Sequence, residues 1–204
     1  MRVKKVSAAE HYRNEGSAKW STVQQETIRM LPTPVAMQPT EYIRVSWEGR
    51  GHGKIAEMVV SAVHDGEIAA FRMQWKAAKN NPKDAAAIAL PVRGAPPLAT
   101  MGMPGSPVNM LHWMANNERV RSVFAEGIGT TAPGPEVKVN GSGSWSDGSW
   151  RVVVTRALGL GDDVAPLVAG EKTGIGFALW EGANEERAGI KAFSVDWLDL
   201  TLDA

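Results

Sequence analysis

The sequence of 204 residues contains no cysteine. This absence excludes disulfide bonds, Fe–S clusters, thiolate zinc sites, haem attached through C-x-x-C-H, and cysteine nucleophiles. Neither charge is in excess, because 22 Lys and Arg balance 22 Asp and Glu. Broad binding to nucleic acid or to anionic membranes needs a basic surface, so a formal net charge of zero argues against both.

Long hydrophobic runs are missing as well. No stretch approaches the roughly 18 apolar residues of a membrane span, and no apolar segment of signal-peptide length follows the basic start Met-Arg-Val-Lys-Lys. If the protein leaves the cytoplasm, we expect it to travel bound to a partner subunit or to lose a signal sequence after export.

Signatures of several enzyme classes are also absent. The sequence has no G-x-x-x-x-G-K-[S/T] phosphate loop, no H-E-x-x-H zinc motif and no G-x-S-x-G nucleophile motif. The four histidines are scattered, and we interpret three of them as turn or surface residues. His112 is the exception, because it lies in Met-Leu-His-Trp-Met beside a Gly/Pro-rich loop, where an imidazole could serve as a ligand.

The patterns that are present favour β-structure. Residues 43–47 alternate between apolar and polar side chains, which predicts a half-buried strand. Asp65-Gly66 and Asp147-Gly148 each lie between strand-like runs, and Asp-Gly is typical of a type I′ hairpin turn. The other predicted strands cover residues 55–63, 67–75, 109–113, 150–156, 174–180 and 192–202.

A few segments depart from this pattern. We expect residues 1–25 to form a polar N-terminal arm with one short helix, and Asp84 to cap an Ala-rich helix over residues 85–90. Residues 91–107 hold five prolines and predict a loop. No repeat, linker or alternation of strands with long helices is visible. The sequence therefore predicts one mainly β domain over residues 1–204, an antiparallel β-sandwich with a few short helices in loops.

Two stretches hold side chains that can bind a metal without cysteine. The first is Thr-Met-Gly-Met-Pro-Gly-Ser-Pro-Val-Asn, residues 100–109, in which methionines are flanked by Gly and Pro. A thioether is a soft, neutral ligand that suits haem iron, so Met101 or Met103 is a candidate.

The second stretch covers residues 185–197. Period-two alternation places Lys191 on the same face as Phe193, Val195 and Trp197. Either the strand begins after Lys191, or the side chain reaches outward to water, or the amine points inward. Burial would lower the pKa of an inward amine, and a neutral amine has a lone pair that can bind iron.

Together these segments resemble the γ subunits of ethylbenzene dehydrogenase and related complex molybdoenzymes. The resemblance lies in Leu-Pro-Val-Arg-Gly, Thr-Met-Gly, Gly-Ser-Pro-Val-Asn and an aromatic-Trp pair, and then in Ala-Leu-Trp-Glu-Gly-Ala-Asn-Glu-Glu-Arg with a lysine shortly after. Leu-Pro-Thr-Pro at residues 31–34 is also similar. The similar segments are spread over nearly the whole chain.

The resemblance implies a β-sandwich that binds one haem b through a Met/Lys axial pair. Carried over residue by residue, the ligands fall on Met101 and Lys191, with Met103 as an alternative methionine. Asn109 belongs to the same Gly-Ser-Pro-Val-Asn segment and is a candidate for contact with the cofactor. Where the family can show a lysine after the Trp, this chain has Met114, so a lysine there is not needed.

Two arginines are further candidates for the cofactor site. Arg93 and Arg187 could pair with haem propionates, because a guanidinium matches the geometry of a carboxylate. Apart from such pairing, each would be an ordinary surface or structural arginine.

The resemblance also implies a role without bond chemistry of its own. Family members work in an αβγ complex, in which α holds a molybdenum cofactor, β holds Fe–S clusters, and γ exchanges electrons with a soluble carrier such as a cytochrome c. We therefore expect a periplasmic electron-transfer subunit. An alternative is a carbohydrate-binding β-sandwich, which would display some of the 8 Trp residues on an exposed face. A purely structural subunit is a third interpretation.

Overall fold

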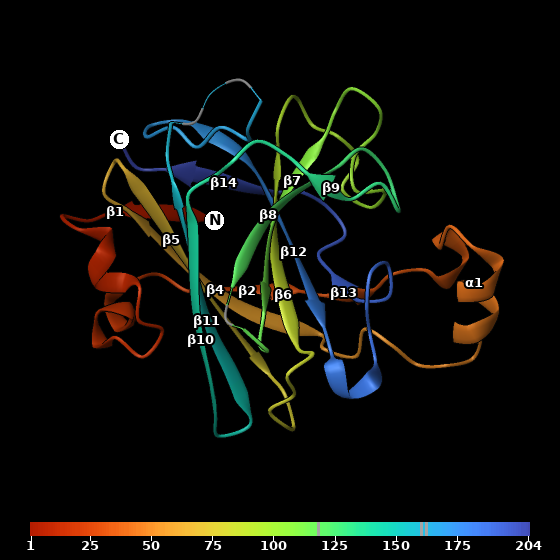
Figure 1. Cartoon of the computed structure of the whole chain (residues 1–204). Helices are drawn as coiled ribbons and strands as arrows, with labels where there is room; N and C mark the ends of the chain where they lie inside the picture. The colour runs from red at the N-terminus through yellow and green to blue at the C-terminus, as the bar shows by residue number, and fades with distance from the viewer. Residues whose placement is uncertain (118, 160, 162) are drawn as a thin grey trace.

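The structure is a computed structural model that describes residues 1–117, 119–159, 161 and 163–204. Its strands form two layers that pack face to face (Figure 1). The first layer has the order β10 (Val139–Ser146), β11 (Ser149–Ala157), β5 (Ile68–Lys76) and β4 (Glu57–His64), and β2 (Glu26–Arg29) also pairs with β4. The second has the order β14 (Leu198–Leu202), β12 (Lys172–Trp180), β6 (Ala85–Pro91), β7 (Val108–Met114), β8 (Val120–Ala125) and β9 (Ala132–Pro133).

The first strand of the chain connects the two layers. β1 (Arg2–Lys5) pairs with β14 through its first residues and with β4 through its last residues, and both pairings are parallel. The other strand pairs described are antiparallel. The predicted β-sandwich is therefore confirmed, with β1 as the departure from a purely antiparallel arrangement.

The core lies between the two layers and contains three tryptophans. Trp113 of β7 meets Trp150 of β11 edge to face at 5.2 Å between ring centroids, and Trp75 of β5 lies 6.3 Å from both. A Cβ atom added to Gly143 of β10 would lie 2.4 Å from the Trp113 ring. Glycine at this position lets the strand β10 approach the indole closely.

Both predicted hairpins are present. Asp147 and Gly148 between β10 and β11 have φ of 52° and 68°, as a type I′ turn requires. Between β4 and β5 only Gly66 has a positive φ, of 97°. There the Asp65 carboxylate instead accepts hydrogen bonds from the backbone N–H groups of Glu67 and Ile68, which closes the turn.

The strand predicted at residues 43–47 is wrong, because the segment forms the helix α1 (Glu41–Trp47). The hydroxyl of Thr40 caps it by accepting a hydrogen bond from the N–H of Ile43 at 3.3 Å. Trp47 is its only buried residue, while Tyr42 and Val45 are 76% and 64% exposed. Five alternating residues are too few to distinguish a strand from a short helix that buries one side chain.

The helix predicted over residues 85–90 is also wrong. These residues form β6, a strand between β12 and β7 in which every residue is buried. Cross-strand pairing and burial on both faces override the helix propensity of alanine. Asp84 caps no helix; its carboxylate accepts hydrogen bonds from Trp150 Nε1 and from the N–H of Gly182, each at 2.8 Å.

The chain ends differ from the prediction as well. Residues 1–25 contain β1 and two 3-10 helices, η1 (Ala9–Tyr12) and η2 (Ala18–Thr22), where one short helix was expected. Tyr12 and Trp20 pack against the outer face of the first layer, so this segment covers the sheet. The strand expected at 192–202 is two strands, β13 (Ala192–Phe193) and β14. Among the described residues, no helix has the length and hydropathy needed to cross a membrane.

Candidate cofactor site

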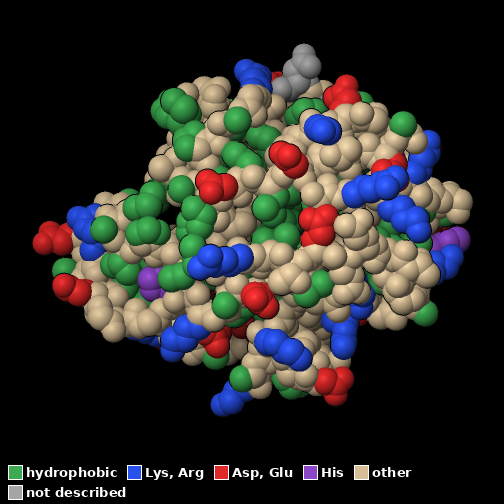
Figure 2. Space-filling view, turned by 180° about the vertical axis from the view of Figure 1, so that it is seen from behind, with side chains coloured by type: hydrophobic (Ala, Val, Ile, Leu, Met, Phe, Trp, Pro, Cys, Tyr) green, Lys and Arg blue, Asp and Glu red, His purple; other side chains and the backbone are tan. Residues whose placement is uncertain are grey.

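A cavity of about 1100 Å³ lies on the outer face of the second layer. Alternation along the strands decides which side chains reach it: Leu111 and Trp113 of β7 point into the core, whereas Met110, His112 and Met114 line the cavity. The walls come from α1, from residues 185–191 and from residues 128–131. In the space-filling view, apolar side chains gather around a hollow beside the α1 region, at the left (Figure 2).

The floor of the cavity is largely apolar and includes the small side chain of Ala85 next to the indole of Trp180. Behind them, Ala87 of β6 and Ala178 of β12 join the same hydrophobic cluster, together with Phe193. The alternating partners on β6, Ala86 and Ile88, belong to the core instead. The alanine run that suggested a helix therefore leaves room on this face of the sheet for a bulky ligand.

Met101 and Lys191 meet at this cavity. Lys191 Nζ lies 3.3 Å from Met101 Sδ, and both residues line the wall. Met101 is held in a turn: its N–H donates to Leu98 O at 2.9 Å, and its own carbonyl accepts from the N–H of Gly127 at 3.1 Å. Its φ of 59° is uncommon for a residue with a side chain.

The amine of Lys191 is inside the protein. The residue is 6% exposed and directly precedes β13, so the strand begins after Lys191 and the side chain nevertheless points inward. Among the described residues it makes no ion pair, and its ammonium nitrogen lies 5.5 Å from the Trp180 ring centroid. Burial lowers the pKa of Lys191 from 10.5 to about 8, so that much of the amine is neutral at mildly alkaline pH.

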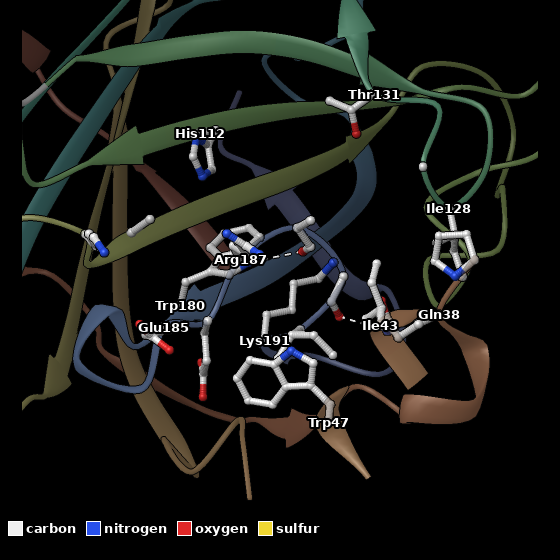
Figure 3. A pocket seen from close by; sticks show the side chains of 18 of the residues that line it. Gln38, Ile43, Trp47, His112, Ile128, Thr131, Trp180, Glu185, Arg187 and Lys191 are labelled. Carbon is white, nitrogen blue, oxygen red and sulfur yellow. Dashed lines mark hydrogen bonds between the residues drawn. The ribbon is translucent and has the colours of Figure 1, made fainter. Parts of the chain in front are cut away.

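His112 brings a second nitrogen donor to the same cavity (Figure 3). Its ring packs edge to face on Trp180 at 5.0 Å. Burial, together with the nearby charges of Arg121 and Lys191, lowers the pKa of His112 to about 4, so the imidazole is neutral at pH 7. Within the described part of the chain, no group of three or more His, Cys, Asp or Glu is placed to hold a metal ion.

The structure places some of the candidate residues predicted from the sequence at the cavity and others away from it. Met101, Lys191 and Arg187 line the cavity, and Arg187 is exposed at its edge. Arg93 does not line it and pairs with Asp163 at 2.9 Å on the surface. Asn109 is fully buried on β7 and donates to Ser122 Oγ at 2.9 Å and to Val123 O, both on β8.

The two methionines of the Gly/Pro-rich loop are also separated. Met103 is 50% exposed in a turn with Ser106, and it is not among the residues that line the cavity. Met114, where the related γ subunits can have a lysine, lies on the cavity floor. The geometry therefore favours Met101 over Met103 as the thioether of the site.

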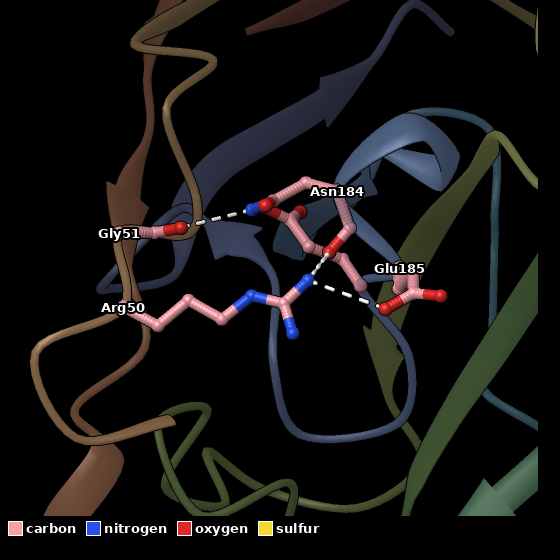
Figure 4. A network of polar contacts seen from close by, with 5 residues as sticks. Arg50, Gly51, Asn184 and Glu185 are labelled. Atoms are coloured by element: carbon pink, nitrogen blue, oxygen red, sulfur yellow. Dashed lines mark hydrogen bonds and ion pairs between the residues drawn. The ribbon is translucent and has the colours of Figure 1, made fainter. Parts of the chain in front are cut away.

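Several lining residues were not identified from the sequence. They include Trp47 of α1 and Arg121 of β8, which lies opposite His112 in the β7–β8 register. Arg50, just after α1, donates to Asn184 O at 2.9 Å and pairs with Glu185 at 3.4 Å, while Asn184 Nδ2 donates to Gly51 O (Figure 4). This network fixes the α1 wall against the loop that carries Lys191.

The sequence of the chain is similar to a protein family and to subunits of several oxidoreductases. Residues 128–192 match the family described as ethylbenzene dehydrogenase. Over 121 residues the chain is 36% identical to the chlorate reductase subunit gamma of Ideonella dechloratans, which covers 57% of this chain and 49% of that protein. It is 25% identical over 193 residues to the dimethylsulfide dehydrogenase subunit gamma of Rhodovulum sulfidophilum, covering 88% and 71%.

The chain is a relative of the γ subunits of the ethylbenzene dehydrogenase and dimethylsulfide dehydrogenase type. A putative respiratory nitrate reductase heme subunit of Haloferax mediterranei is 34% identical over 116 residues, which is 56% of this chain and 41% of that protein. The chain thus spans about half or less of the length of the chlorate and nitrate reductase subunits that it matches. The region that matches the ethylbenzene dehydrogenase family, residues 128–192, includes Lys191 and Arg187.

Solved structures with the same fold have very different sequences. A family 9 carbohydrate-binding module of Caldicellulosiruptor kristjanssonii in complex with glucose superposes with a TM-score of 0.58 at 9% identity, covering 100% of this chain and 95% of the other. A putative carbohydrate-binding protein of Bacteroides uniformis has a TM-score of 0.52 at 9% identity, covering 100% and 98%. At such identity the likeness shows the β-sandwich fold of this γ-subunit relative.

Proposed function

We propose that this chain is a haem b electron-transfer subunit of a molybdenum-containing dehydrogenase or reductase complex. The observation that carries the proposal is the contact between Lys191 Nζ and Met101 Sδ, at 3.3 Å, in the wall of a cavity with an apolar floor. Two segments 90 residues apart in the chain bring two potential iron donors to one point. A thioether and an uncharged amine are both chemically suited to haem iron.

The size and lining of the cavity fit such a cofactor. Its volume of about 1100 Å³ exceeds the range of roughly 300–1,000 Å³ of ordinary small-molecule pockets. Met110, Met114 and Trp180 supply an apolar lining. For Met101 and Lys191 both to hold a haem, their side chains would have to move apart from the present contact. Both are long and unbranched, with several rotatable bonds.

A bound haem would supply a one-electron couple at its iron. The residues of this chain would set the properties of that couple. The thioether of Met101 would favour the reduced state, and a neutral Lys191 would add no negative charge to offset the positive charge of the iron. The apolar floor limits the access of water. Arg187 at the edge of the cavity, and Arg121 on its wall, offer guanidinium groups to carboxylates.

The assembly and the location of the chain belong to the same proposal. The names of the relatives describe subunits of oxidoreductases, and one is described as a heme subunit, which supports an electron-transfer role. We infer an Fe–S β subunit and a molybdenum-cofactor α subunit as partners, a soluble carrier such as a cytochrome c as the other redox partner, and the periplasm as the location.

The burial of the tryptophans argues against the alternative, a carbohydrate-binding module. That function would use indole rings displayed on an exposed face. All eight tryptophans are described by the structure and none is exposed; Trp145 and Trp197 are partly buried and the other six are buried. Sugar binding therefore has support from the fold alone.

The absorption spectrum after reconstitution with haemin tests the proposal. We expect a Soret band with the features of six-coordinate low-spin haem, and its loss or conversion to high spin in Met101→Ala and Lys191→Ala. Met103→Ala is the matched control, because this exposed methionine of the same loop lies outside the cavity. An unchanged low-spin spectrum in both ligand variants, or no haem uptake by the wild type, would refute the assignment.

A further inference from the structure

The backbone of Lys191 is held by an unusual pairing with Thr33. The short strand β3 (Leu31–Pro32) pairs with β13, so that Pro32 lies opposite Ala192, and the next residues in register are Thr33 and Lys191. The N–H of Thr33 donates to Lys191 O at 3.0 Å, as in an antiparallel ladder. The reciprocal bond is different: the N–H of Lys191 donates to the side-chain hydroxyl oxygen of Thr33 at 3.3 Å.

The carbonyl of Thr33 has another partner, which explains why the hydroxyl takes its place. His52 Nε2 donates to Thr33 O at 2.7 Å. The hydroxyl of Thr33 in turn donates to Gly189 O at 2.6 Å, its shortest contact. It also lies 3.2 Å from Lys191 O, a second carbonyl acceptor. One hydroxyl therefore contacts three backbone groups: it accepts from the N–H of Lys191 and is within donating distance of the carbonyls of Gly189 and Lys191. Thr33 is 7% exposed, so water does not readily replace these bonds.

Two other segments pack closely against the backbone of residues 189–191. Gln38 Nε2 also donates to Gly189 O, at 3.1 Å, and a Cβ atom on Gly189 would lie 2.0 Å from Gln38 Oε1. A Cβ atom on Gly53 would lie 2.9 Å from Lys191 O. The peptide of Lys191 is thus confined by side-chain hydrogen bonds and close packing, while its side chain is free of ion pairs among the described residues.

We propose that Thr33 is a positioning residue for Lys191: its hydroxyl replaces a ladder hydrogen bond and fixes the backbone from which the amine enters the cavity. This inference rests on the proposed function, in which Lys191 binds the iron. It gives a role to the Leu-Pro-Thr-Pro segment, which lies far from the other motifs in sequence. Groups that orient a metal ligand without touching the metal commonly change metal affinity by roughly 10–100-fold.

The test compares Thr33→Val, which removes the hydroxyl and keeps the shape, with Thr33→Ser, which keeps the hydroxyl. We expect Thr33→Val to bind haem roughly 10–100-fold more weakly and to lose low-spin character, and Thr33→Ser to restore the wild-type spectrum. Thr155→Val is the matched control, because Thr155 is 3% exposed on β11 in the other layer. Wild-type affinity and spectrum in Thr33→Val would overturn the proposal.

A measurement without haem separates this inference from the proposed function. In the apoprotein, we expect hydrogen exchange of the Lys191 amide to accelerate in Thr33→Val and to stay at the wild-type rate in Thr33→Ser. An unchanged exchange rate in Thr33→Val would overturn the role of the hydroxyl, whatever the cofactor. Lys191→Ala is run in parallel: if it keeps the wild-type haem spectrum, the ligand assignment fails, and the exchange result alone decides on Thr33.

A second variant covers the case in which Thr33→Val is not recovered folded. Gln38→Leu removes the other side-chain donor to Gly189 O. It is expected to speed exchange of the Lys191 amide and to weaken haem binding in the same direction. No change in either measurement would count against the proposal.

Discussion

The amine of Lys191 and the thioether of Met101 lie 3.3 Å apart at the end of two unrelated segments of the chain. Met101 belongs to the Gly/Pro-rich loop between β6 and β7, and Lys191 belongs to the loop that leads into β13. The fold therefore directs both donors to one place in the cavity wall. The chemistry expected at the site depends on how easily the amine becomes neutral.

Haem binding should therefore depend on pH. Burial lowers the pKa of Lys191 to about 8, so the amine is mostly protonated at pH 7 and must lose a proton to bind iron. We expect the apparent affinity for ferric haem to fall roughly tenfold for each pH unit below about 8, and to level off above it. His112, with a pKa of about 4, stays neutral over this range and adds no slope.

Titrations of haemin into wild type and Lys191→Ala between pH 6 and 9 measure this dependence. The slope should disappear in the variant, which has no amine to deprotonate. A pH-independent affinity in the wild type would show that Lys191 is not a ligand, or that it is already neutral.

The reduction potential gives a second prediction. With a thioether and a neutral amine as ligands, we expect a high-potential haem. Met101→His should lower the midpoint, because an imidazole favours the oxidised iron more than a thioether does. A potentiometric titration of both proteins measures the difference. A strongly negative midpoint in the wild type would contradict the Met/Lys pair.

Both hairpin turns and the strands β4, β5, β7, β11 and β12 could be predicted from the sequence, because their signals are local. The strands β8 and β10 were not predicted. Asp147-Gly148 folds as expected because both of its residues adopt the positive φ that the turn needs. The alanines of β6 misled because their environment is set by β7 and β12, which are distant in sequence. At α1, a five-residue alternation carries too little information to define a period.

The candidate site could be predicted only in part, because some of its residues reach the cavity through the pairing of strands, which the sequence does not show directly. Met101 and Lys191 were found through their motifs, and His112 through its place next to the Gly/Pro-rich loop. Arg121 was missed because it reaches the cavity only through the β7–β8 register, which pairs it with His112. Arg93 and Arg187 look equivalent in sequence, and the fold places only Arg187 at the cavity.

These two arginines provide a matched pair for a third prediction. Arg187→Gln should weaken haem binding, because it removes a cation at the edge of the cavity that can pair with a propionate. The residue is exposed, so water screens the interaction and the expected loss is about 1 kcal/mol or less, roughly fivefold in affinity. Arg93→Gln should leave the affinity unchanged, since Arg93 pairs with Asp163 outside the cavity. Equal effects of the two substitutions would refute a specific role for Arg187.

The close packing of β10 on Trp113 gives a prediction about stability. In Gly143→Ala the added Cβ atom would lie 2.4 Å from the Trp113 ring, so the indole or the strand must move. Trp113 is fully buried against Trp75 and Trp150, and a shift would disturb the whole cluster. We expect the free energy of unfolding to fall by about 1–3 kcal/mol, the usual cost of overpacking a core. Gly161→Ala is the control, because its added Cβ would have no atom of the described residues within 4 Å. Chemical denaturation of both variants measures the difference, and a Gly143→Ala protein as stable as Gly161→Ala would show that the two layers are packed less tightly at this edge than the structure indicates.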